Sequence, residues 1–89
     1  MVEKEIIISN KLGLHARAAA KLVQLCARFS SPVFLHCRGK EINGKSILGV
    51  MMLAAGKGTT VILRAQGPDE AEAIAAAADL FDRKFDEGE

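Results

Sequence analysis

The residues best suited to chemistry lie in one short segment, residues 13–18, which reads GLHARA. Gly13 allows the backbone to turn sharply, and His15 then falls at or just before the start of a predicted helix. The N-terminus of a helix carries about half a positive charge and several unpaired amide donors, so it can hold an anion. Arg17 adds a permanent charge and a planar set of donors suited to phosphate oxygens.

The same positive field favours the neutral imidazole of His15, which is the form that a nucleophile requires. The segment therefore predicts a histidine that accepts a phosphoryl group, with Arg17 stabilising that group. The alternative is structural, because a lone histidine at a helix start can serve only as a polar cap. No second acid or base lies beside His15 in the sequence, which gives little support to hydrolysis by the chain alone.

Ser46 is the second candidate, and it precedes another predicted helix. As an N-cap it would contribute about 1 kcal/mol to stability. The functional alternative is regulatory phosphorylation, because a phosphate at a helix N-terminus adds about −1.5 to −2 charges without melting the helix. Such a phosphate would act by repelling or blocking a partner.

The helix predicted after Ser46 is crowded with large apolar side chains: Ile47, Leu48, Met51 and Met52. Four such groups exceed what one narrow stripe of a two-turn helix can bury. We expect some of them to be exposed as an adaptable docking patch. The alternative is a wide buried face.

Other polar residues give weaker signals. His36 and Cys37 are neighbours in a predicted strand, so they point to opposite faces and cannot share a metal ion. Cys26 falls on an apolar stripe and is expected to be a small buried residue. The GKGT sequence at residues 56–59 lacks the glycine spacing of a phosphate loop and precedes a strand. We predict neither a metal site nor a cofactor.

Short elements of alternating type surround these segments. Strands are predicted at 5–8, 33–37, 41–42 and 59–65, and helices at 16–29, at 47–55 and after Asp69, which is a plausible N-cap. This β-α-β-β-α-β-α order indicates an α+β fold with three helices packed on one face of a largely antiparallel four-stranded sheet. The pattern does not choose between a ferredoxin-like strand order and other split arrangements.

The two long helices show clear periodicity. The apolar stripe predicted for the first comprises Ala19, Leu22, Val23, Cys26 and Phe29, and the stripe for the last comprises Ile74, Ala77, Ala78, Phe81 and Phe85. Arg17, Lys21 and Arg28 form a basic outer face on the first helix. The sequence SSP at 30–32 is expected to end that helix and Gly56 the second, while residues 86–89 read as a frayed acidic end.

Composition limits the classes of function. The 89 residues suit one domain, residues 1–89, and the net charge of +1 gives no bulk attraction to nucleic acid or membranes. Without Trp or Tyr and with four Phe, a base-stacking surface has little support, as has a generic small-molecule or RNA-binding α+β domain. The apolar run at 6–8 is too short for a signal or membrane segment. Two cysteines do not make a disulfide framework, so we expect a cytoplasmic protein.

Two motifs carry a resemblance to a known family. Residues 10–17, NKLGLHAR, resemble the active-site motif of HPr, the histidine-containing phosphocarrier family of the bacterial phosphotransferase system. Residues 43–51, NGKSILGVM, resemble that family's regulatory-serine motif. The motifs have the family's usual separation, and the resemblance extends to about Phe85. It implies an HPr-like open-faced β-sandwich.

The resemblance also implies roles for individual residues. His15 would accept a phosphoryl group on Nδ1 from phosphorylated enzyme I, itself charged by phosphoenolpyruvate, and pass it to an enzyme IIA domain in sugar uptake or a related regulatory phosphorelay. The chain would then be a stoichiometric carrier rather than an enzyme. Arg17 would steady the phosphoryl group. Ser46 would be the target of an HPr kinase/phosphorylase, and a transcriptional regulator would recognise the product.

Partner binding is expected at the motif and along both helices, through Ala16, Ala18, Lys21, Arg28, Ile47, Leu48 and Met51. One departure from the family pattern is Ala18, where the family commonly has proline. Alanine restores a backbone N–H and loosens the turn in the unfolded chain. Two alternatives remain open: a carrier of a nitrogen-related branch, and a regulatory interaction module that acts through phosphorylated Ser46. We expect a monomer.

Overall fold

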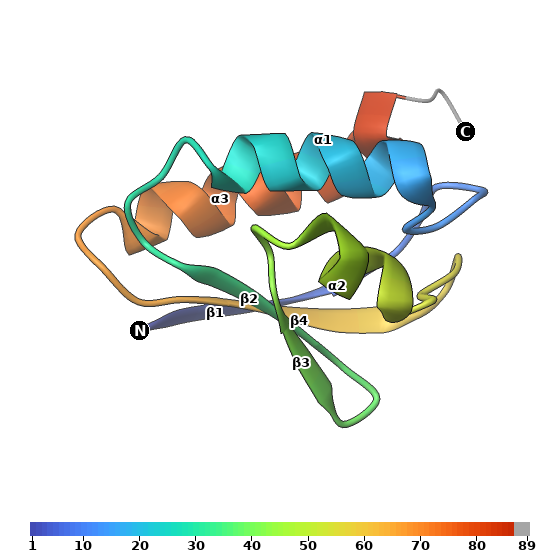
Figure 1. Ribbon diagram of the computed structural model, residues 1–89, viewed down its shortest axis with the longest axis horizontal. Helices are drawn as coiled ribbons and strands as arrows, with labels where there is room; N and C mark the ends of the chain where they lie inside the picture. The colour runs from blue at the N-terminus through green and yellow to red at the C-terminus, as the bar shows by residue number, and fades with distance from the viewer. Residues whose placement is uncertain (87–89) are drawn as a thin grey trace.

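The computed structural model describes residues 1–86. Four strands form one antiparallel sheet in the order β1-β4-β2-β3, and they are β1 (Val2–Ile7), β2 (Val33–Cys37), β3 (Lys40–Asn43) and β4 (Thr60–Ala65). The helices are α1 (Ala16–Cys26), α2 (Ile47–Met52), α3 (Glu70–Asp82) and a short 3-10 turn, η1 (Lys84–Asp86). Figure 1 shows α1 and α3 side by side over one face of the sheet, with α2 beneath α1. The predicted element order and fold class are confirmed.

The two central strands alternate between a buried and an open face. Val61, Leu63 and Ala65 of β4 are buried, and Leu63 lies opposite Leu35 of β2. Thr60, Ile62 and Arg64 alternate with them and therefore face away from the helices. The sheet thus has one face packed against helices and one face without such cover, which is the open-faced arrangement.

Small residues let the helices approach the sheet closely. The residues that α1 buries are Ala18, Ala19, Leu22 and Cys26, and those of α3 are Ala73, Ile74, Ala77, Ala78, Leu80 and Phe81. Phe85 of η1 closes this core, and its ring meets that of Phe81 edge-on at 4.9 Å between centroids. No helix within residues 1–86 is long and apolar enough to cross a membrane.

Two helices end earlier than predicted. The last residue of α1 is Cys26 rather than Phe29, and the chain continues through tight turns in which Arg28 and Phe29 donate to carbonyls three residues back. The last residue of α2 is Met52, so Gly56 is not its terminator. Instead Ala54 adopts a left-handed φ of 50°, and the Arg38 guanidinium donates to the carbonyls of residues 53 and 54. A side chain from a distant turn therefore satisfies the end of α2.

The last helix and the outer strands also differ from prediction. Asp69 stands at the N-cap position of α3, but its carboxylate does not cap the helix. Phe85 is buried as predicted, although it lies in η1 with a φ of 56° and not on the α3 stripe. β1 begins at Val2, and β3 extends over Lys40–Asn43. Of the predicted frayed end, residues 87–89 lie outside the described residues.

Candidate functional site

The loop before α1 is fixed by backbone contacts to the segment that follows α2. Gly13 has a φ of +64°, and a Cβ placed there would lie 2.4 Å from the carbonyl oxygen of Ala55. Leu14, which is buried, donates its N–H to that same oxygen at 2.9 Å. Only glycine fits this close approach in the left-handed region. The contact determines where the chain enters α1.

His15 occupies the N-cap position of α1, as predicted. Its backbone is extended, with φ −73° and ψ 177°, and its carbonyl accepts the first helical bond, from Ala19 N–H at 2.8 Å. The imidazole is half-buried and makes no capping hydrogen bond. The backbone amides of residues 16–18, which lie between His15 and Ala19, therefore have no acceptor within the helix or on the His15 side chain. The first turn also contains no acidic residue.

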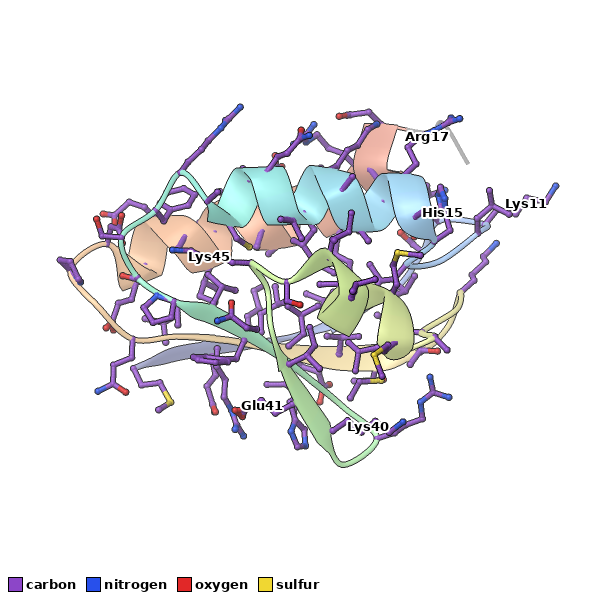
Figure 2. All side chains as sticks on the ribbon, in the orientation of Figure 1. Lys11, His15, Arg17, Lys40, Glu41 and Lys45 are labelled. Carbon is purple, nitrogen blue, oxygen red and sulfur yellow. The ribbon has the colours of Figure 1, made fainter. Side chains whose placement is uncertain are left out.

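Cationic side chains surround this helix end. Arg17 is exposed on the first turn, and Lys11 is exposed on the preceding loop. Figure 2 shows Lys11, His15 and Arg17 at the same end of the molecule. Two full charges thus add to the positive end of the α1 dipole. The arrangement suits a dianionic group bound at the His15 ring.

Ser46 is the N-cap of α2, as predicted, and its hydroxyl accepts the N–H of Gly49 at 3.1 Å. The residue is exposed. Of the apolar residues that follow, Val50 is fully buried, whereas Leu48 is 69% exposed and Met52 is 74% exposed. Ile47 and Met51 are about two-fifths exposed, at 41% and 40%. The expectation that part of this helix is an exposed apolar surface is confirmed.

One predicted partner contact, Ala18, requires correction, and a second, Lys21, is partly engaged within the chain. The Ala18 side chain is fully buried beneath α1, so only its backbone N–H remains at the helix start. Lys21 is half-buried, and its ammonium donates to the carbonyl of Phe85 at 2.5 Å. That bond ties α1 to η1 and uses one of the three N–H donors of the ammonium within the chain. Ala16 and Arg28 are exposed, as a contact surface requires.

Sequence reasoning missed two residues that build the site. Asn10 is fully buried, and its side-chain amide donates to the carbonyl of Gly13 at 2.8 Å. Asparagine three residues before a glycine is a typical turn pattern, so the structural role of Asn10 could have been predicted from the sequence. The carbonyl of Ala55 accepts the N–H of Leu14. No sequence pattern indicates this contact, because it joins segments about 40 residues apart.

Comparison with known proteins identifies the class of protein to which this chain is similar. The family model described as "PTS HPr component phosphorylation site" matches residues 2–83. A phosphocarrier protein HPr from Cupriavidus necator is 53% identical over all of both chains. The crystal structure of an HPr from Thermoanaerobacter tengcongensis matches with a TM-score of 0.94 and 48% identity over 98% of each chain. Crh of Bacillus subtilis, described as a swapped dimer, matches with a TM-score of 0.76 and 46% identity over 94% of this chain and 97% of that one.

The chain belongs to the HPr family of phosphocarrier proteins. Its role is that of a phosphoryl carrier in the phosphotransferase system, and its partners are components of that system. A carrier needs an acceptor atom, a cradle for the phosphoryl group and a surface for docking. The described residues place His15, Arg17 and Lys11 at one end of the molecule, where such a site can be sought.

Proposed function

We propose that His15 is the phosphoryl acceptor and that the open N-terminus of α1 holds the phosphoryl oxygens. The observation that carries this proposal is the combination at α1 of an uncapped first turn, no acidic residue and Arg17. At many helix N-termini a capping side chain or a first-turn carboxylate interacts with the unpaired amides. Here the positions that receive such groups lie beside a histidine ring.

The transfer step needs only groups that the carrier and its donor supply. The Nδ1 lone pair of neutral His15 attacks phosphorus, and the phosphorus–nitrogen bond in phosphorylated enzyme I breaks. The bonding electrons return to the donor's imidazole, so the step consumes no water and changes no oxidation state. The reverse sequence on an enzyme IIA domain discharges His15 and regenerates the carrier. This cycle makes the chain a stoichiometric reactant rather than an enzyme.

The first turn contributes through placement of donors. The transferring group spreads its charge over three oxygens, and we propose that Arg17 and the backbone amides at the start of α1 donate to them. Ala18 supplies an N–H where the family motif commonly has proline, which has none. We infer that this carrier holds the phosphoryl group with one donor more than such relatives do.

We further propose that residues 1–89 act as one cytoplasmic domain and as a monomer. The docking surface consists of exposed Ala16 at the start of α1, Ile47, Leu48 and Met51 on α2, and Arg28 just after the end of α1. It would meet acidic, apolar surfaces on enzyme I and enzyme IIA. The identity of the sugar or regulatory branch depends on which enzyme IIA domain that surface accepts.

The test uses the chain's two histidines as a matched pair. Incubation with phosphoenolpyruvate and enzyme I should give an acid-labile, base-stable phosphate that His15→Ala abolishes. His36→Gln should be phosphorylated normally, because His36 Nδ1 is inaccessible to solvent and lies on the open face of β2. In the same assay Arg17→Gln should slow transfer, while Lys40→Gln removes one positive charge from an exposed residue of β3 and serves as its control. Normal labelling of His15→Ala would overturn the proposal.

Ser46 supports a second function, the regulation of docking. Its exposed hydroxyl lies at the start of α2, directly before the exposed apolar residues Ile47 and Leu48. A phosphate there would keep the cap, since its oxygens can accept the Gly49 N–H in place of the hydroxyl, and would place up to two negative charges beside the docking surface. A kinase/phosphorylase and a transcriptional regulator would be the partners of this form.

Variants separate the two functions. Ser46→Asp should slow phosphoryl transfer from enzyme I without unfolding the chain, whereas Ser46→Ala should cost about 1 kcal/mol of stability and leave transfer unchanged. Binding to a regulator that depends on Ser46 and not on His15 would favour the interaction-module alternative. Dependence on His15 alone would exclude it. Transfer to a nitrogen-related enzyme IIA in preference to a sugar-specific one would identify the branch.

A further inference from the structure

β1 lies at one edge of the sheet, and the direction of its backbone groups can be derived. Ile8, the residue after β1, donates its N–H to Thr59 and accepts the N–H of Gly58, so both of its polar groups point toward β4. These groups alternate in direction along a strand. Lys4 and Ile6 therefore bond toward β4 as well. The N–H and C=O groups of Glu3, Glu5 and Ile7 point outward from the sheet.

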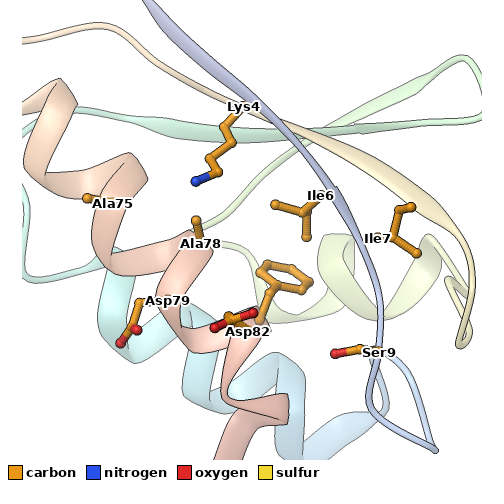
Figure 3. Close-up of a pocket in the computed structure, with 9 residues that line it drawn as sticks. Lys4, Ile6, Ile7, Ser9, Ala75, Ala78, Asp79 and Asp82 are labelled. Carbon is orange, nitrogen blue, oxygen red and sulfur yellow. The ribbon is translucent and has the colours of Figure 1, made fainter.

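A groove runs beside this outward edge. It measures about 590 Å³ and lies between β1 and α3, with Lys4 and Ile6 on the strand side and Ala78, Asp79 and Asp82 on the helix side. Figure 3 shows the side chains of both elements converging on the groove. Lys4 and Ile6 lie opposite Leu63 and Val61, which face the helices. The groove is therefore on the helix side of an unpaired strand edge.

Charge distinguishes the two sides of the edge. Glu3 and Glu5 project to the open face, where Glu3 pairs with Arg64 and Glu5 has no ion-pair partner among residues 1–86. On the groove side Asp79 is paired with Arg83 at 2.8 Å, while Asp82 has no such partner in the described chain. Each side of the edge thus offers one carboxylate that is not engaged by a cation.

These features together define a surface for strand addition. We propose that the β1 edge binds an extended peptide segment of a partner protein, with basic side chains over Glu5 and small apolar side chains in the groove against Ile6 and Ala78. Strand addition draws affinity from main-chain hydrogen bonds and specificity from alternate side chains. Here the outward backbone groups of Glu3, Glu5 and Ile7 would supply the main-chain hydrogen bonds, and the adjoining groove would select the side chains. The surface lies apart from the docking residues of α1 and α2.

A second copy of this chain fits the edge poorly. The antiparallel register that pairs the outward residues Glu3, Glu5 and Ile7 of two β1 edges places Glu5 directly opposite Glu5, and like charges directly opposite are destabilising. Charged residues on edge strands are a general device against such self-association. The same glutamate favours a strand that carries lysine or arginine at that position.

The test uses hydrogen exchange with a seven-residue peptide of alternating lysine and valine, capped at both ends. Binding should slow exchange of the Glu3, Glu5 and Ile7 amides by about tenfold or more and leave those of Lys4 and Ile6 unchanged. N-methylation of the peptide's lysines should abolish the effect, because their amides face β1. N-methylation of its valines should preserve the effect. No slowing at the three outward amides would overturn the proposal.

Protein variants supply the second arm. Glu5→Lys should weaken peptide binding by about tenfold, while Glu72→Lys makes the same charge change on an exposed residue of α3 and should leave binding nearly unchanged. Equal losses of peptide affinity in both variants would show nonspecific attraction and contradict the proposal. Slowed exchange of the outward amides that depends on protein concentration, without peptide, would indicate self-association and would also contradict it. His15 phosphorylation should be normal in both variants, so the result is independent of the proposed carrier site.

Discussion

The N-termini of α1 and α3 both lack a side-chain cap bond, but they differ in the charge of the first turn. At α3 the first turn holds Glu70 and Glu72, and the Glu70 carboxylate accepts the N–H of Gly67 at 3.1 Å. At α1 the first turn has no acid, and the N-cap side chain of His15 makes no capping bond. Neither N-cap side chain bonds to its helix, but the first turn of α3 contains carboxylates, whereas among the described residues the first turn of α1 contains a cation and no acid.

The difference separates stability from function. A carboxylate in the first turn stabilises a helix by about 0.3–1 kcal/mol, and α1 forgoes that gain. The loop before α1 compensates through the buried Asn10 and the close approach of Gly13 to Ala55. The chain thus positions α1 by backbone contacts that leave the amides at its start available.

Among variants that keep His15, the largest loss of transfer is expected from Gly13→Ala. The new methyl group would collide with the Ala55 carbonyl, and the left-handed φ would add strain, so the start of α1 must move. We expect a destabilisation of about 2–4 kcal/mol and a severe loss of phosphorylation. Gly39→Ala is the control, because Gly39 also has a positive φ but has no atoms near its Cβ position. Equal effects in urea unfolding would contradict the role given to the Ala55 contact.

A smaller effect on transfer is expected from Ala16→Glu, which makes α1 resemble α3. The carboxylate would stabilise the helix by about 0.3–1 kcal/mol while repelling the incoming phosphoryl group. We expect phosphorylation by enzyme I to slow by about tenfold, which corresponds to about 1.4 kcal/mol. Gln24→Glu adds the same charge late in α1 and should have little effect on the rate. A rate unchanged by Ala16→Glu would show that the open helix start is not used.

No effect on transfer is expected from Asp69→Asn, although it should lower stability. Hydrogen bonds from the Ser31 hydroxyl and the Ser30 N–H hold the pKa of Asp69 below its usual value. The stability due to the ionised carboxylate is therefore full above the unfolded pKa of about 3.9 and is lost as pH falls through the lower native pKa. Urea unfolding should show the gap between the two proteins closing at acid pH. A gap that does not depend on pH would contradict this assignment.

The parts of the fold that local pattern determines were predicted correctly. Strand alternation, the apolar stripe of α1 and the cap at Ser46 all depend on neighbours within a few residues. Helix ends were predicted less well because distant groups decide them. The Arg38 guanidinium terminates α2 from the turn between β2 and β3, and no local signal reveals it.

The site shows the same division. Spacing alone placed His15 and Arg17 at a helix start, because both belong to one turn. The burial of Ala18 and the bond from Lys21 to Phe85 depend on packing against α3 and η1. Asp69 was predicted to cap α3, but its carboxylate instead accepts the N–H of Ser31, which is 38 residues away in sequence. The sequence near Asp69 does not reveal this long-range partner.

The most direct test of the central claim is nuclear magnetic resonance of the protein charged by phosphoenolpyruvate and enzyme I. The account predicts a single phosphohistidine signal with phosphorus on Nδ1 of His15. It also predicts that the amide protons of residues 16–18 shift downfield more than any at the N-terminus of α3. Phosphate on another residue, or a charged His15 whose neighbouring amides do not respond, would contradict the account.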